Sequence, residues 1–332
     1  MEDFLTSFFV APFTGLATGI ASATSPLDVI DAVDGFVWGP IMILLLLFTH
    51  IFMTVRTGFI QRKLGTGIKM SVTKDDPSDA SGDITQFGAL TTALAATIGT
   101  GNIVGVGTGL LFGGPGAIFW MWIIALLGMA TNYAEAVMAQ KTRVVDEDGT
   151  VHGGPVYYIT TAFKGNGGKF LAGFFAVAII LALGFMGCMV QSNSIAETMN
   201  TAFGIPTWVM GLIVVILAGT VFIGGVSRLA AVTEKIVPIM AAFYIVGCVV
   251  ILVMNYKTLP NAFTQIFVLA FNPQAMAGGV AGVTVQQAMR FGVARGLFSN
   301  EAGMGSTPHA HALAKVNHPR EQGAVAILGV FI

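Results

Sequence analysis

The chain has 332 residues, of which 55% are hydrophobic and 10% are charged, and its formal net charge is −1. Soluble globular domains carry roughly 25% charged residues, so this composition excludes an ordinary soluble domain and predicts an all-α polytopic membrane protein in a lipid bilayer. The near-neutral charge gives no reason to expect a nucleic-acid partner, and two cysteines provide neither a disulfide framework nor a metal site.

Residues 1–35 contain five acidic residues and no lysine or arginine, so they lack the basic start of a signal peptide. Ser25-Pro26 opens an amphipathic pattern that predicts a short helix on the outer membrane surface. Residues 4–22 are apolar enough to enter the membrane, but Pro12 and two glycines weaken a helix there, so both positions stay open. We expect this N-terminal segment to be extracytoplasmic.

Apolar runs bounded by charged or turn-forming residues predict a series of membrane-spanning helices. The predicted spans are residues 38–58, 85–111, 115–139, 169–199, 206–224, 228–255 and 275–298, and an eighth helix begins near Ala324. Thirteen of the sixteen basic residues then fall on one face of the membrane, so the positive-inside rule makes that face cytoplasmic and puts the N-terminus outside. In one cytoplasmic loop, Asp148-Gly149 predicts a tight hairpin turn. The chain stops about nine residues into the last apolar run, so we expect it to be a piece of a longer protein.

A polar, glycine-rich hexamer, Thr97-Ile-Gly-Thr-Gly-Asn102, lies in a 51-residue stretch that contains no Asp, Glu, Lys or Arg. The stretch is long enough for two spans, so the hexamer is predicted to lie at bilayer depth. Gly99 and Gly101 weaken the helix, and the threonines and the asparagine bring polar groups to the same place. Such residues are tolerated in lipid where they line a cavity, so we predict a local break and a small-ligand site. The alternative is a helix-packing face built by two G-xxx-G steps, at Gly101, Gly105 and Gly109.

Two further polar side chains lie inside predicted spans. Gln191 shares a helical face with Gly184, Gly187 and Ser194, and its amide suits the carboxylate and ammonium groups of an amino acid. The alternative for Gln191 is a hydrogen bond that joins two helices. Glu135, near the cytoplasmic end of the third span, is a candidate protonation site, an interfacial acid or a gating partner.

The seventh predicted span carries several glycines together with Arg290 and Arg295, and it is followed by Ser299, Asn300 and Glu301. A helix this rich in glycine and charge at membrane depth is predicted to be discontinuous. Its arginines should face a cavity or a carboxylate, for which Glu301 is available. All five residues are therefore candidates for gating, with a structural ion pair or snorkelling as the alternative.

Three motifs are similar to those of a known family. The run from Gly113 to Gly128, GGPGAIFWMWIIALLG, resembles the signature of the alanine or glycine:cation symporter family, the sodium:alanine symporters. Residues 97–102 and 295–303 are similar to two other stretches typical of that family. The resemblance runs from about residue 36 to the end of the chain.

The resemblance implies a LeuT-type architecture of two inverted five-helix repeats. An extra helix and a cytoplasmic loop (36–84) would precede the first repeat (85–256). The remaining residues (257–332) would form an incomplete second repeat, truncated soon after its start. Transporters of this design bind substrate and ion near the midplane, at broken helices.

The resemblance also implies residue roles. Thr100 and Gly101 would offer backbone N–H groups to a substrate carboxylate, in a site that includes Thr97 and Gly99. The Thr97 carbonyl and the Asn102 side chain would ligate sodium. Gln191 would close the substrate pocket.

The implied function is sodium-coupled uptake of alanine, glycine or another small neutral amino acid across the plasma membrane, with no covalent chemistry and no cofactor beyond the sodium ion. Three other mechanisms stay open. Coupling to protons would involve Glu135. An intramembrane enzyme would need a nucleophile such as Ser192 or Ser194 with a histidine at depth, and a channel would give flux that does not saturate.

Overall fold

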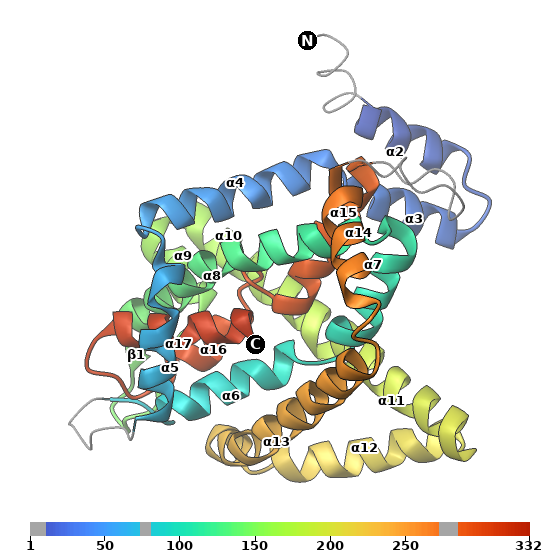
Figure 1. The fold of residues 1–332 in the computed structure, drawn as a ribbon. Coiled ribbons are helices and arrows are strands. Elements are labelled where there is room, and N and C mark those ends of the chain that lie inside the picture. The colour runs from blue at the N-terminus through green and yellow to red at the C-terminus, as the bar shows by residue number, and fades with distance from the viewer. Residues whose placement is uncertain (1–10, 74–80, 272–284) are drawn as a thin grey trace.

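The computed structural model describes residues 11–73, 81–271 and 285–332, which form a helical bundle with one small hairpin (Figure 1). The N-terminal elements are α2 (Ala11–Ala21), α3 (Pro26–Val37), α4 (Pro40–Arg56), the 3-10 turn η2 (Ile60–Lys63) and α5 (Leu64–Val72). Next come α6 (Gln86–Thr97), the π-helical turn η3 (Gly101–Gly105), α7 (Val106–Gly113), α8 (Gly116–Thr142), α9 (Pro155–Ala162) and α10 (Asn166–Ile179). They are followed by the π-helical segment η4 (Ile180–Gly187), α11 (Cys188–Phe203), α12 (Thr207–Phe222), α13 (Gly225–Met254) and α14 (Leu259–Phe271). The C-terminal helices are α15 (Val285–Asn300), α16 (Thr307–Ala312) and α17 (Pro319–Phe331).

Within the described residues, four helical stretches are long and apolar enough to cross a membrane. They are Pro26–Arg56, Gly116–Thr142, Asn166–Phe203 and Gly225–Met254. A fifth span is added if α6 and the bent segment Gly101–Gly113 are counted together. Large apolar side chains on α10 and α13, such as Phe170 and Phe243, are exposed by 73% and 83%, as expected for helices that contact lipid rather than water.

Most predicted spans agree with the helices observed. The amphipathic segment after Ser25 is helix α3, and Ser25 and Asp28 form a capping box at its start. The helix α14 was not predicted. Part of the predicted span 275–298 lies outside the described residues, and from Val285 onward it is the helix α15.

The last helix begins earlier than predicted, at Pro319 rather than near Ala324. His318 caps it, Glu321 completes a capping box, and Pro319 occupies the first turn, where it has no N–H to satisfy. These polar residues start the helix before its apolar run begins, so an apolar pattern alone sets its start too late.

Helix α8 lies at the centre of the fold and packs against α4, α14, α15, α16 and α17. The approach of α15 to α8 depends on glycine. A Cβ on Gly292 would overlap the Ala117 carbonyl, and a Cβ on Gly296 would overlap the Ile124 side chain. Small residues let membrane helices pack closely where no hydrophobic force drives them together.

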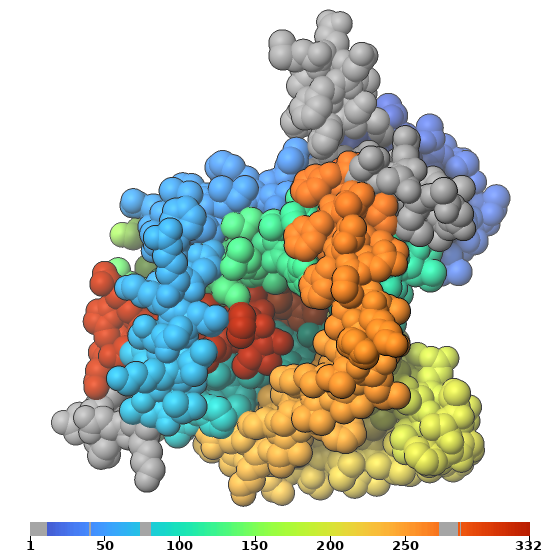
Figure 2. Space-filling view, viewed as in Figure 1, coloured from blue at the N-terminus to red at the C-terminus, as the bar shows by residue number. Residues whose placement is uncertain are grey.

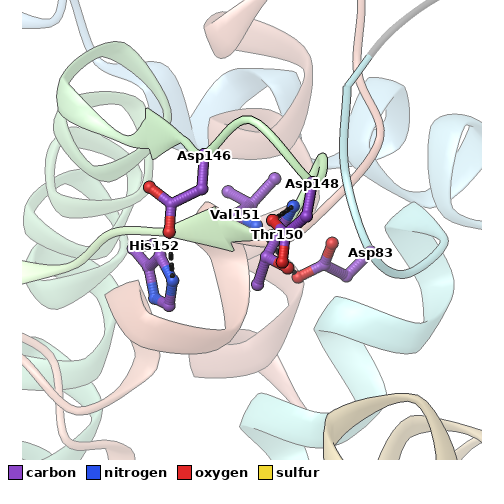
Figure 3. A network of polar contacts seen from close by, with 6 residues as sticks. All are labelled: Asp83, Asp146, Asp148, Thr150, Val151 and His152. Carbon is purple, nitrogen blue, oxygen red and sulfur yellow. Dashed lines mark hydrogen bonds and ion pairs between the residues drawn. The ribbon is translucent and has the colours of Figure 1, made fainter.

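The predicted hairpin is confirmed. Strands β1 (Val144–Val145) and β2 (Val151–His152) pair antiparallel around the turn that contains Gly149. Figure 3 shows the polar contacts that hold it. His152 and Asp146 form an ion pair at 3.1 Å, and the Val151 N–H donates to Asp83 at 3.4 Å. The Thr150 backbone N–H donates to Asp148 at 3.0 Å, and this bond holds the pKa of Asp148 below its usual value.

Candidate functional site

The helix that contains the polar hexamer is broken. α6 ends at Thr97, and Ile98 takes an extended conformation with φ −82° and ψ 99°. The chain resumes as η3 and α7, and the two halves are bent by 54°. The predicted break is therefore confirmed. It leaves backbone groups of the second span outside a regular helix.

Side chains near the break bond to its backbone. Asn102 Oδ1 accepts the Gly99 N–H at 3.0 Å, and the Gln191 Oε1 accepts the Thr100 N–H at 3.3 Å. A Cβ on Gly99 would overlap the Gln191 carboxamide, so that amide packs directly on the glycine backbone. The Thr100 hydroxyl is buried without a partner among the described residues. The structure thus brings together the hexamer and Gln191, which are far apart in the sequence.

Gln191 reaches the break from α11, one turn after η4. The predicted common face of Gly184, Gly187 and Gln191 assumed a regular α-helix. That assumption is wrong for Gly184 and Gly187, because residues 180–187 are π-helical and have more residues per turn. Short π-helical segments are frequent at functional sites, so η4 marks the same region.

The glycines of the second span also pack, as the alternative prediction stated. The Cβ position of Gly101 lies 3.2 Å from Phe298 Cδ1 and from Ser299 Cα, so η3 abuts the end of α15. A Cβ on Gly109 would overlap Met121 of α8. Packing and a break therefore coexist in this span.

A second interruption lies beside the first. α15 is regular over its described length, from Val285 to Asn300, and the interruption follows it. Three residues of the turn, Glu301, Gly303 and Gly305, have positive φ values of 55°, 90° and 82°. The helical path resumes only at Thr307. Over the described residues, the prediction of a break within 275–298 is therefore wrong, and the interruption comes after Asn300.

A cavity of about 290 Å³ lies between the two interruptions and α8. Its polar lining comes from Thr97, Asn102, Arg295, Ser299 and Asn300. The remaining lining is largely apolar and includes residues of α8 and α17. Figure 2 shows one face of the molecule hollowed, with C-terminal residues (red) recessed between the light-blue segment around α5 and the orange column that includes α14.

The two arginines differ in their surroundings. Arg295 lines the cavity, as predicted, and its Nε is buried without a partner among the described residues. The guanidinium of Arg290 lies 5.7 Å from the ring centroid of Phe291. Neither arginine pairs with Glu301, whose carboxylate accepts the Ser306 hydroxyl, so the alternative of a structural ion pair with Glu301 is wrong. Glu301 sits in the turn after α15 with a positive φ of 55°.

Residues 23–332 match the sodium:alanine symporter family. The chain belongs to this family. It is therefore a multi-pass membrane protein of a transporter family, in agreement with its candidate spans.

Three relatives show the extent of the match. The chain is 46% identical to an uncharacterized transporter of Haemophilus influenzae, over 92% of the chain and 66% of the relative. It is 46% identical to a sodium/alanine symporter of Methanococcus maripaludis, over 92% and 67%. It is 36% identical to an amino-acid carrier protein of Bacillus subtilis, over 92% and 63%. The chain thus spans about two thirds of the length of these relatives.

Glu135 does not line the cavity of this symporter-family chain. Its side chain is 6% exposed, and its carboxylate accepts the Gly303 N–H at 3.0 Å. Of the three predicted roles, an acid at the membrane interface fits this burial least. The contact joins α8 to the turn after α15.

Several buried polar residues were not predicted as a group. The His50 Nδ1 lies 2.6 Å from the Thr131 hydroxyl, and Thr307 donates to Asn132 at 2.7 Å. Asn132 donates in turn to the Ala326 carbonyl at 2.8 Å. These bonds join α8 to α4, α16 and α17. The adjacent polar pair in the middle of an apolar helix, Thr131-Asn132, was the available signal.

Proposed function

We propose that this protein is a symporter that imports alanine, glycine or another small neutral amino acid with sodium across the plasma membrane by alternating access. The break at residues 97–102 carries this proposal. It supplies unwound backbone beside a cavity, and Gln191 contacts it from another helix. The name of the Methanococcus relative, a sodium/alanine symporter, agrees with this substrate and this ion.

We assign the substrate carboxylate to the N–H groups of Thr100 and Gly101, in a site that includes Gly99. The N-terminal end of a half-helix favours negative charge, and η3 and α7 begin there. The Gln191 oxygen occupies the position beside the Thr100 N–H that a carboxylate oxygen would take. Substrate would displace this oxygen, and the Gln191 amide would then close over the ligand.

We assign sodium to the Thr97 carbonyl and to Asn102. Unwound carbonyls and amide oxygens coordinate such ions in transporters with broken helices. Asn102 Oδ1 accepts one N–H in this structure and has a second lone pair to offer a cation. Both residues line the cavity of about 290 Å³.

The architecture we propose is the LeuT type, with a first repeat over residues 85–256, a second beginning at 257, and the N-terminus outside the cell. The two neighbouring interruptions, after Thr97 and after Asn300, support it because each repeat would contribute one broken helix. Arg290, Arg295, Ser299, Asn300 and Glu301 would belong to the gating region around the second interruption.

Coupling to protons is the second candidate, because Glu135 is a buried acid near the site. Its carboxylate accepts the N–H of Gly303, which lies three residues after the cavity-lining Asn300. An enzymatic function has less support. The Ser192 hydroxyl donates to the Cys188 carbonyl of its own helix at 2.8 Å, and the family is one of transporters.

The test is uptake of radiolabelled alanine by the purified protein in liposomes. We expect saturable uptake that is driven by an inward sodium gradient and lost when potassium or choline replaces sodium. Uptake that is unchanged without sodium, but that follows a proton gradient, would support the second candidate. Uptake that does not saturate would support a channel.

A further inference from the structure

The turn between α15 and α16, residues 301–306, has a backbone suited to binding an anion. Glu301, Gly303 and Gly305 have left-handed φ angles, and right-handed or extended residues separate them. Such alternation turns successive N–H groups toward one side and forms a concave anion site. The Ala302 N–H is already taken, because Asn300 Oδ1 accepts it at 2.9 Å.

The anion in this site is the carboxylate of Glu135. Glu135 Oε2 accepts the Gly303 N–H at 3.0 Å, and Gly305 follows two residues later on the same turn. No basic side chain among the described residues forms an ion pair with it. A buried carboxylate is costly unless hydrogen bonds compensate it, and bonds from N–H groups to a charged acceptor are among the stronger ones.

The surroundings of the turn join three helices. The Cβ position of Gly303 lies 3.7 Å from His50 Cε1 and 3.7 Å from Thr131 Cγ2, so the turn rests on the polar contact between α4 and α8. Among the described residues, the other titratable groups at the turn are Tyr158 of α9, which interacts electrostatically with Glu135, Glu301, which is bonded to Ser306, and His309, whose Nδ1 lies 3.2 Å from the Ser306 carbonyl.

The turn directly follows the residues that face the first break. Ser299 lies against Gly101, and Asn300 lines the cavity with an Nδ2 that has no partner among the described residues. Because α15 runs straight into the turn, any movement of the turn relative to α8 moves Ser299 and Asn300 relative to η3. The bond from the Gly303 N–H to Glu135 therefore ties α8 to the segment that carries Ser299 and Asn300.

We propose that Glu135 is a positioning residue that anchors the 301–306 turn to α8 and thereby holds Ser299 and Asn300 against the break in α6. Its carboxylate acts as a fixed acceptor for the Gly303 backbone N–H and not as a carrier of protons. This role rests on the transport function proposed above. Of its two tests, alanine uptake depends on that function, whereas hydrogen exchange does not.

The first test is hydrogen exchange of the purified protein, followed by mass spectrometry of peptides. In Glu135→Gln the charged acceptor becomes a neutral amide oxygen, which accepts the Gly303 N–H more weakly, so we expect amides of residues 301–306 to exchange at least about tenfold faster than in the wild type. Peptides from the middle of α8 should be unchanged. The control is Glu197→Gln, because Glu197 is an exposed acid on α11.

Unchanged exchange at 301–306 in Glu135→Gln would overturn the anchor. If Glu135→Gln unfolds, so that exchange accelerates throughout the protein, Glu135→Asp is the variant that tests the anchor. Aspartate keeps the charge but is shorter by one methylene, so we expect faster exchange confined to the turn. Wild-type exchange in the aspartate variant would also overturn the proposal.

The second test is alanine uptake in liposomes as a function of pH. We expect Glu135→Gln to raise the KM for alanine about tenfold, to change kcat less than twofold, and to keep the shape of the pH profile. A flattened pH profile, or uptake no longer driven by a proton gradient, would make Glu135 a proton carrier and overturn the anchor. Absence of alanine uptake in the wild type would count against the proposed transport function, while the exchange result would still decide the anchor.

Discussion

Gly99 gives the sharpest test of the proposed site. Its backbone does not have a positive φ, so alanine is compatible with its conformation. The new methyl group would overlap the end of the Gln191 side chain, which is flexible and can move away. Gly99→Ala should therefore displace Gln191 without unfolding the protein.

The loss of folding stability and the loss of affinity for alanine are expected to differ in size. Displacing Gln191 removes its bond to the Thr100 N–H, which costs stability about 1 kcal/mol. If Gln191 closes over a zwitterionic substrate, Gly99→Ala also removes a hydrogen bond from Gln191 to a charged group of the substrate. Such a bond contributes about 1.5–3 kcal/mol to the binding free energy. Affinity for alanine should then fall about ten- to a hundredfold, while thermal stability without ligand falls only slightly.

The assay is the alanine concentration needed to raise the melting temperature in the presence of sodium, since a ligand that binds only the folded state stabilises it. Gly107→Ala is the matched control, because a Cβ at Gly107 meets nothing within 4 Å. Gln191→Ala should lose the same affinity, and the double variant no more than either single one. Wild-type affinity in Gly99→Ala, or losses that add in the double variant, would refute the assignment of Gln191.

Three other predictions concern ion binding, packing and pH. Asn102→Ala should raise the sodium concentration for half-maximal alanine uptake at least about fivefold, and an effect on alanine affinity alone at saturating sodium would contradict its role as a ligand. Gly116→Ala should lower the stability of the protein by about 1–3 kcal/mol in thermal unfolding, because the methyl group meets the backbone of Leu269, which cannot move aside as a side chain can. Gly211→Ala, with nothing within 4 Å of its Cβ, should have little effect. Burial lowers the pKa of His311 to about 4, so the folded chain keeps this histidine neutral while the unfolded chain is protonated below about pH 6.5. The stability of the wild type should therefore fall as the pH drops from about 6.5 to 4, and the melting temperature of His311→Asn should fall less steeply over that range.

The features that could be predicted from the sequence are those in which a local pattern decides the structure. The long uncharged stretch had to contain two spans, and a glycine-rich polar hexamer inside it could not form an ordinary lipid-facing helix. The break after Thr97 followed. The hairpin at Asp148-Gly149 was predictable for the same reason, since its turn residues determine a local conformation.

Over the described part of the predicted span 275–298, the expected break is absent, because glycine has two uses in a membrane helix. The glycines of α15 were interpreted as a sign of unwinding, but Gly292 and Gly296 allow α8 to approach closely, and the helix stays regular around them. Which use applies depends on the neighbouring helix. That neighbour comes from a distant part of the chain, so the sequence pattern of α15 alone cannot distinguish packing from unwinding.

The sequence by itself determined the class of the protein, the approximate positions of most spans, the break at residues 97–102 and the resemblance to the symporter family that the comparison confirmed. The tertiary structure decided which polar groups meet: Gln191 with Thr100, Glu135 with Gly303, and Glu301 with Ser306 rather than with an arginine. The physical reason is that a buried polar group must be paired, whereas the identity of its partner depends on how helices from remote parts of the chain pack.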